Sequence, residues 1–302
     1  MTMQVLFTVT VGRSGSDFVA RTLNHFGIGV RAEHEPPNLL LARLGEHRFF
    51  SRRGWLHQGS RWAQIGRSLQ RRYLFPDEDL GRGPAFEWVE HGEVDKMRRA
   101  VERKARRIER FAERGYSHYV EVSQFFIRTQ ADAFFERFPN LGLIKLTRDP
   151  IMAARSLANR DKDILAGGAP PHYRQNIFSV PESAGLTRFQ VFLHRWIETE
   201  LRFHAYVART GVSKVFHLRT EELGDRDKLA ALFDYFGMAH RPIQILPATN
   251  TNASQGAPKT VISPRDIAEA AALLDRMPEN LRRQVPELDA ALRARQLSHS
   301  AA

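Results

Sequence analysis

The start of the chain decides the fold, because residues 5–11 read VLFTVTV, residues 12–17 read GRSGSD and residues 18–23 read FVARTL. An apolar, β-branched run is followed by a short Gly/Ser loop and then by a helix-compatible stretch. This order predicts a strand over 5–11 and a helix over 16–26. The loop would direct backbone N–H groups and the positive end of the helix dipole at one point, where an anion is stabilised.

The loop differs from the phosphate loop of nucleotide triphosphatases. Their pattern, G-x-x-x-x-G-K-[ST], places a Lys on the β- and γ-phosphates and a Ser or Thr on magnesium. Here Gly15 is followed by Ser16 and Asp17, so both groups are missing, and the cation of the loop is Arg13. Gly12 and Gly15 would let the backbone approach a phosphate closely. The loop therefore indicates a phosphate cradle for a nucleotide bound without a metal, with an ordinary strand–helix turn as the alternative.

A second segment carries the same kind of signal. Residues 141–147 read LGLIKLT, which predicts a buried strand, and Pro150 suits the first position of a helix predicted over 150–159. Arg148 lies at the end of this strand, and Ser156 lies about two turns into the helix. Both residues can face the carboxyl edge of a parallel sheet, where α/β proteins bind their ligands.

Three segments, in this order, resemble the sulfotransferases that use 3′-phosphoadenosine 5′-phosphosulfate (PAPS): Gly12–Ser16, Leu146–Ser156 and His217–Leu223. The resemblance implies that a set of loop residues surrounds the 5′-phosphosulfate, namely Gly12, Arg13, Ser14, Gly15, Ser16 and Asp17. It also implies that Arg148 and Ser156 hold the 3′-phosphate. Asp17 is a departure, because the family usually has a hydroxyl residue there. A carboxylate repels the ligand unless it turns away and favours the helix N-terminus.

The resemblance also implies the reaction, in which PAPS gives its sulfonate to a hydroxyl acceptor, or as second choice an amine, without a metal. The acceptor would be a glycan or a small molecule, and the other product 3′-phosphoadenosine 5′-phosphate. Arg13 and the loop amides would stabilise the charge on the leaving phosphate. In the carbohydrate and tyrosyl branch of the family a Glu followed closely by Pro is the base, which indicates Glu35, with His34 as second candidate. Alternatively, Glu35 pairs with an Arg and His34 is an orienting or packed side chain.

Residues 119–123, YVEVS, resemble the E-K-[ST] stretch of the glycan enzymes in that family. Val122 stands where those enzymes have a Lys. If that Lys helps catalysis there, this chain would use another cation for the same purpose or none. Glu121 would contact the acceptor or, equally, form a buried structural ion pair.

The alternation of strands and helices indicates an α/β fold with a parallel sheet flanked by helices, in the P-loop-like sulfotransferase architecture that the resemblance implies. We expect one domain over residues 1–302. Within it, residues 38–115 are expected to be a mostly helical cap on the acceptor side, and Trp196 is expected in the core. Further strands are expected over 27–31, 118–122 and 214–218, and further helices over 131–138, 187–210 and 225–236, with two more between 264 and 294.

The composition narrows the classes of protein. The 302 residues include 45 Lys and Arg against 34 Asp and Glu, a net charge of +11 that attracts polyanions, and there is no Cys. No apolar run approaches the ~20 residues of a membrane span and no signal peptide opens the chain, so a cytoplasmic protein is expected. A basic helix over 96–107 is either a solvated face or a polyanion groove. Two other functions stay open: a P-loop kinase or nucleotide triphosphatase, and a non-catalytic basic protein that binds nucleic acid.

Overall fold

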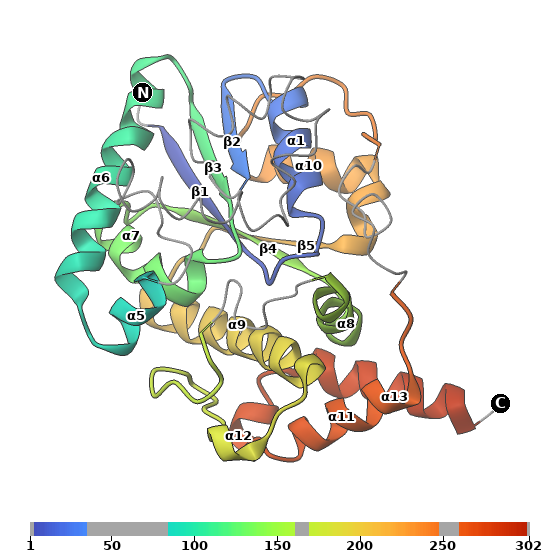
Figure 1. The fold of residues 1–302 in the computed structure, drawn as a ribbon. Helices are drawn as coiled ribbons and strands as arrows, with labels where there is room; N and C mark the ends of the chain where they lie inside the picture. The colour runs from blue at the N-terminus through green and yellow to red at the C-terminus, as the bar shows by residue number, and fades with distance from the viewer. Residues whose placement is uncertain (1–2, 35–83, 161–168, 248–259, 301–302) are drawn as a thin grey trace, which may run out of the picture.

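The computed structural model describes residues 3–34, 84–160, 169–247 and 260–300. These residues form an α/β fold around a five-stranded parallel sheet with the order β2-β3-β1-β4-β5, which confirms the predicted fold class (Figure 1). The strands are β1 (Gln4–Val9), β2 (Val30–His34), β3 (His118–Val122), β4 (Gly142–Thr147) and β5 (Val215–Arg219). β1 is the central strand, and it is buried from Val5 to Val9 because helices cover both of its faces.

Helices pack on both faces of the sheet (Figure 1). One face is covered by α1 (Ser16–Phe26) and α10 (Arg226–Tyr235), whose leucines and phenylalanines bury Leu6 of β1. The other face is covered by α6 (Val94–Glu113), the π-helical turn η1 (Phe126–Gln130) and α7 (Ala131–Arg137). Phe7 points to this second face, where its ring stacks on that of Phe126 with 4.2 Å between centroids. Successive residues of β1 thus enter different cores, as strand geometry requires.

A third core lies beside the carboxyl end of the sheet (Figure 1). It is built by α8 (Pro150–Arg160), α9 (Arg188–Thr210), α11 (Pro264–Leu274), α12 (Glu279–Arg282) and α13 (Pro286–Ser300). Trp196 is buried in it, as predicted. The long helix α9 begins after Thr187, whose hydroxyl accepts a hydrogen bond from the backbone N–H of Gln190 at 3.2 Å. It ends at Gly211, which adopts a left-handed conformation.

Two predicted elements are wrong in detail. The second strand was expected over 27–31, but β2 begins at Val30 and includes His34. The preceding glycines form a turn instead: Gly27 caps α1 by donating to Leu23 O, and Gly29 has a φ of +69°. The C-terminal region has three helices where two were expected, because Pro278 and Pro286 separate α12 from α11 and α13.

The predicted cap is described only in its second half. Residues 38–83 lie outside the described ranges, whereas residues 84–113 contain α5 (Pro84–Glu90) and α6. α6 has an apolar stripe that is buried against the sheet and contains Met97, Val101 and Ile108. No helix in the ranges described above combines the length and apolar character needed to cross a membrane.

Candidate functional site

The loop between β1 and α1 has an unusual backbone. Gly12, Arg13 and Gly15 all have positive φ angles, of +83°, +57° and +87°. Arg13 is the one non-glycine residue with a positive φ in the part of the chain that the structure describes. For an L-residue this left-handed conformation costs about 1–3 kcal/mol, and such strain tends to be kept at functional sites. Alternating backbone conformations of this type form concave nests of N–H groups that bind anions.

Both glycines also have close neighbours. A Cβ atom on Gly12 would lie 3.0 Å from the side-chain oxygen of Gln124, which follows β3. A Cβ atom on Gly15 would lie 2.2 Å from Cδ1 of Leu223, far inside van der Waals contact. The loop is therefore packed between the end of β3 and the segment after β5: a Cβ atom at Gly15 would need Leu223 to move, and one at Gly12 would press on the amide group of Gln124.

The serines of the loop point in different directions. Ser14 is fully buried, and its hydroxyl donates to the carbonyl of Gly12 at 3.3 Å, which closes the loop on itself. Ser16 is the first residue of α1, and its Oγ lies 3.0 Å from Nε2 of His34 at the end of β2. Which of the two groups donates depends on the imidazole tautomer. His34 therefore lies next to the loop, at the carboxyl edge of the sheet.

The three segments singled out by sequence meet at this edge. Arg148, directly after β4, donates from Nη1 to the carbonyl of Arg13 at 2.8 Å. Thr220, directly after β5, donates from Oγ1 to the carbonyls of Ser14 and Thr147, both at 3.0 Å. Burial lowers the pKa of Arg148 from the usual arginine value, because it disfavours the charged form. An anion placed at the loop would offset that cost.

One hydroxyl at the start of the loop lacks a partner. Thr10 is 2% exposed, and among the residues with described positions its Oγ1 has no hydrogen-bond partner. Buried hydroxyl groups are almost always hydrogen-bonded, so such a group next to a concave loop is consistent with a ligand that completes it.

The remaining predicted site residues lie as follows. Asp17 pairs with Arg21 one helical turn later, with 3.1 Å between the carboxylate and Nε, so its side chain lies along α1. Ser156 is buried in α8, with 1% of its surface exposed. Glu35 lies outside the described residues.

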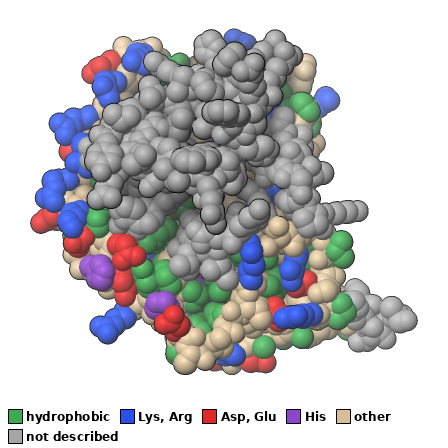
Figure 2. Space-filling view, in the orientation of Figure 1, with side chains coloured by type: hydrophobic (Ala, Val, Ile, Leu, Met, Phe, Trp, Pro, Cys, Tyr) green, Lys and Arg blue, Asp and Glu red, His purple; other side chains and the backbone are tan. Residues whose placement is uncertain are grey.

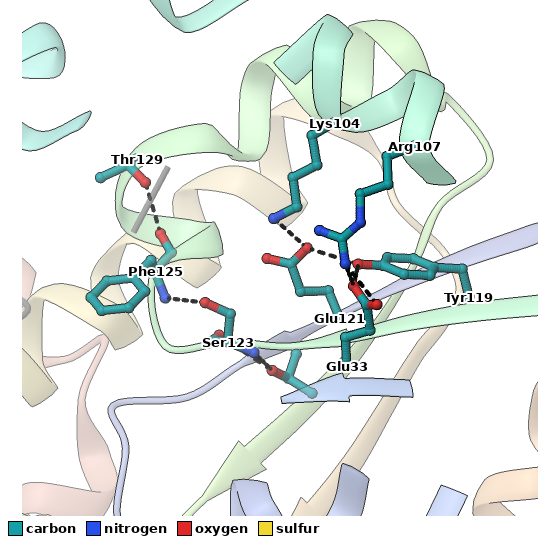
Figure 3. Close-up of polar contacts among 9 residues, drawn as sticks. Glu33, Lys104, Arg107, Tyr119, Glu121, Ser123, Phe125 and Thr129 are labelled. Carbon is teal, nitrogen blue, oxygen red and sulfur yellow. Dashed lines mark hydrogen bonds and ion pairs between the residues drawn. The ribbon is translucent and has the colours of Figure 1, made fainter. Parts of the chain in front are cut away.

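A buried cluster of charges fills the space between α6 and the strands β2 and β3 (Figure 3). Arg107 of α6 donates to both oxygens of Glu33, at 2.7 and 2.6 Å, and the hydroxyl of Tyr119 donates to the same carboxylate at 3.0 Å. Lys104, one turn earlier, lies 2.5 Å from the carboxylate of Glu121. The two glutamates are register partners on neighbouring strands, and each side chain is 1% exposed. Sequence reasoning missed this cluster as a whole.

The cluster decides between the two interpretations of Glu121. Its carboxylate is buried and paired with Lys104, so the structure favours the structural ion pair over contact with an acceptor. Val122 is fully buried on the opposite face of β3, against α1. Burial, followed by the neighbouring carboxylates, raises the pKa of Tyr119 well above its usual value, so the phenol keeps its proton and donates.

Basic side chains also gather on the solvent side of α6 (Figure 2). Arg98 and Arg137 pair with carboxylates, the first with Glu136 at 2.9 Å and the second with Glu102 at 3.2 Å. Arg106 is exposed. Both interpretations of this basic helix, a solvated face and a polyanion groove, stay open on these contacts.

Comparison with known proteins gives no assignment: no protein-family model matches the chain, and no curated protein matches it. In the described ranges there is no cluster of three or more His, Asp or Glu side chains that could hold a metal ion. The functional argument therefore depends on the geometry of the loop and its neighbours.

Proposed function

We propose that the protein is a sulfotransferase that uses PAPS as its sulfonate donor. The observation that carries the proposal is the meeting of three distant segments at one sheet edge: the loop Gly12–Ser16, Arg148 and the segment that begins at Thr220. Their order along the chain resembles that of PAPS-dependent enzymes, and their contacts join them around one concave backbone. A P-loop architecture of that family is part of the proposal.

In this proposal the loop binds the 5′-phosphosulfate. Backbone N–H groups at Gly12–Ser16 and the N-terminus of α1 supply fixed partial positive charge, and Arg13 adds a full charge. Arg148 and Ser156 hold the 3′-phosphate. The guanidinium group of Arg148 has five N–H donors, and the bond to Arg13 O uses one of them, so it can join the loop to a phosphate.

The transfer step moves the sulfonate in line. The acceptor oxygen forms a bond to sulfur while the bond between sulfur and the 5′-phosphate oxygen breaks, and 3′-phosphoadenosine 5′-phosphate leaves. Glu35 takes the proton of the acceptor hydroxyl, with His34 as second candidate for that role. The position of His34 beside Ser16 agrees with either a base or an orienting group. The acceptor class stays a hydroxyl on a glycan or small molecule, and the cytoplasmic location stays a prediction.

Calorimetric titration of the full chain tests the proposal, with 3′-phosphoadenosine 5′-phosphate, adenosine 5′-phosphate and ATP–magnesium as ligands. We expect tight binding of the first and a large loss when the 3′-phosphate is absent. Arg148→Ala should weaken that binding by about 1.5–3 kcal/mol, the value of a lost charged hydrogen bond. Arg98→Ala is the control, since that side chain lies on α6, is half exposed and pairs with Glu136 away from the loop. A preference for ATP–magnesium would instead support the kinase or nucleotide triphosphatase.

A further inference from the structure

The end of β2 is held from two sides. Successive side chains of a strand point to opposite faces, so Glu33 faces α6 while His34 faces α1. Glu33 is bound by Arg107 and Tyr119, and its neighbour His34 contacts Ser16. One peptide bond therefore links the buried charge cluster to the phosphate loop.

β2 needs such an anchor because it is an edge strand. Among the residues that the structure describes, it pairs with β3 alone, and its other edge has no strand beside it in the sheet order. An edge strand is free to fray or to shift in register, and a shift by one residue would exchange the faces of Glu33 and His34. The carboxylate of Glu33 resists this, because it accepts hydrogen bonds from two other elements, from Arg107 of α6 and from Tyr119 of β3.

The chemistry of the anchor fits a positional role. A buried ion pair often stabilises a fold no more than apolar side chains of the same volume would, because both charges lose their water. It does, however, restrict the geometry, since Nη2 of Arg107 contacts both carboxylate oxygens of Glu33 while the Tyr119 hydroxyl donates to one of them. The side chains of these two residues are 12% and 1% exposed, so water does not replace either partner easily.

We propose that Glu33 and Arg107 are positioning residues, whose buried ion pair fixes the end of β2 and thereby holds the imidazole of His34 against Ser16 beside the phosphate loop. The helix α6 then controls the geometry of the site without touching its ligand. The consequence for nucleotide binding depends on the proposed function, whereas the effect on His34 does not.

The contact itself is tested by NMR of the histidine rings in the full chain without nucleotide. His34→Gln identifies the ring signal, and Ser16→Ala defines its position when the hydroxyl partner is lost. We expect Glu33→Gln and Arg107→Gln to move the His34 signal most of the way to its position in Ser16→Ala. Arg98→Gln is the matched control, since it breaks an exposed ion pair with Glu136 on the same helix and should leave the signal unchanged.

A His34 signal that stays at its wild-type position in Glu33→Gln would overturn the proposal. If neither of the charge-removing variants folds, Tyr119→Phe removes a single hydrogen bond to Glu33 and retains the packed ring. It should move the His34 signal in the same direction by a smaller amount. An unchanged signal in a folded Tyr119→Phe would then overturn the proposal in turn.

A double-mutant cycle tests the consequence for the site. Glu33→Gln should weaken binding of 3′-phosphoadenosine 5′-phosphate roughly three- to tenfold, the value of about one hydrogen bond. In a Ser16→Ala background it should add no further loss, because both changes remove the same contact. Additive losses would overturn the coupling. If the wild-type protein does not bind the nucleotide, the proposed function fails while the NMR experiment still decides the role of Glu33.

Discussion

A methyl group added at Gly15 tests the packing of the loop. The residue has a φ of +87°, and a Cβ atom there would lie 2.2 Å from Cδ1 and 3.6 Å from Cγ of Leu223. Gly15→Ala therefore introduces two separate costs, one in the backbone and one in the contact with the segment after β5. Both act at the point where α1 begins, so they disturb the backbone of the loop directly.

The magnitude follows from these two costs. An L-residue in the left-handed region costs about 1–2 kcal/mol. Forcing a methyl group into an occupied space costs typically about 1–3 kcal/mol, because Leu223 must leave its rotamer or the backbone must shift. We therefore expect Gly15→Ala to lower the free energy of unfolding by about 2–5 kcal/mol.

Gly115→Ala separates the two costs. Gly115 has nearly the same φ, +85°, but a Cβ atom there would meet nothing within 4 Å. Its substitution should cost the backbone contribution alone, about 1–2 kcal/mol. Urea denaturation of both variants, followed by circular dichroism, gives the two free energies of unfolding, and their difference measures the contact with Leu223.

The double variant Gly15→Ala/Leu223→Ala completes the test. Removing the leucine side chain opens the space that the new methyl group needs, so the double variant should be more stable than the sum of the single losses predicts. The reasoning is refuted if Gly15→Ala costs no more than Gly115→Ala, or if the effects of Gly15→Ala and Leu223→Ala simply add.

Three further outcomes are expected. Glu35→Gln should abolish sulfonate transfer in an assay with PAPS and leave calorimetric binding of the nucleotide product unchanged. Full turnover in this variant would show that another group is the base. Glu200→Gln should destabilise the protein to urea by about 3–5 kcal/mol, because it leaves the ammonium group of Lys145, now 2.5 Å from the carboxylate, buried without its partner. The double variant Lys145→Met/Glu200→Leu should lower the free energy of unfolding by less than Glu200→Gln alone does. An equal loss in the two proteins would contradict this account. Burial lowers the pKa of His194, so the unfolded chain binds the proton more tightly and stability falls as the pH drops below about 6.5. His194→Asn should make the unfolding temperature depend less on pH in this range. If the pH dependence is unchanged in this variant, other groups are responsible for it.

The sequence predicts the centre of the sheet well and its edge less well. β3 matches the expected range, and α1 does too, because apolar runs and the Gly/Ser loop mark their limits. β2 was misplaced by three residues at each end, since Gly27 and Gly29 interrupt an apolar stretch that reads as a strand. Local patterns do not show that the first glycine caps a helix and that the second turns the chain.

The candidate site also has parts that the sequence predicts and parts that it does not. The loop and Arg148 could be found from local sequence, because each follows directly after a buried strand. The pairing of Glu33 with Arg107 could not, since 74 residues separate them and α6 reads as an ordinary amphipathic helix. One signal was available: Glu121 lies between Val120 and Val122 in a predicted strand, and buried carboxylates require cationic partners.

The strand order has a consequence for how the chain folds. Among the described strands, β1 pairs with β3 and β4, and β2 pairs with β3, so within that part of the chain neither β1 nor β2 has a partner until residues 118–122 are present. Contacts this distant in sequence are formed late, because closing the intervening loop costs entropy before any pairing is gained. During synthesis the loop at residues 12–15 is made before β3, but it is packed in place only when β3 is added between β1 and β2.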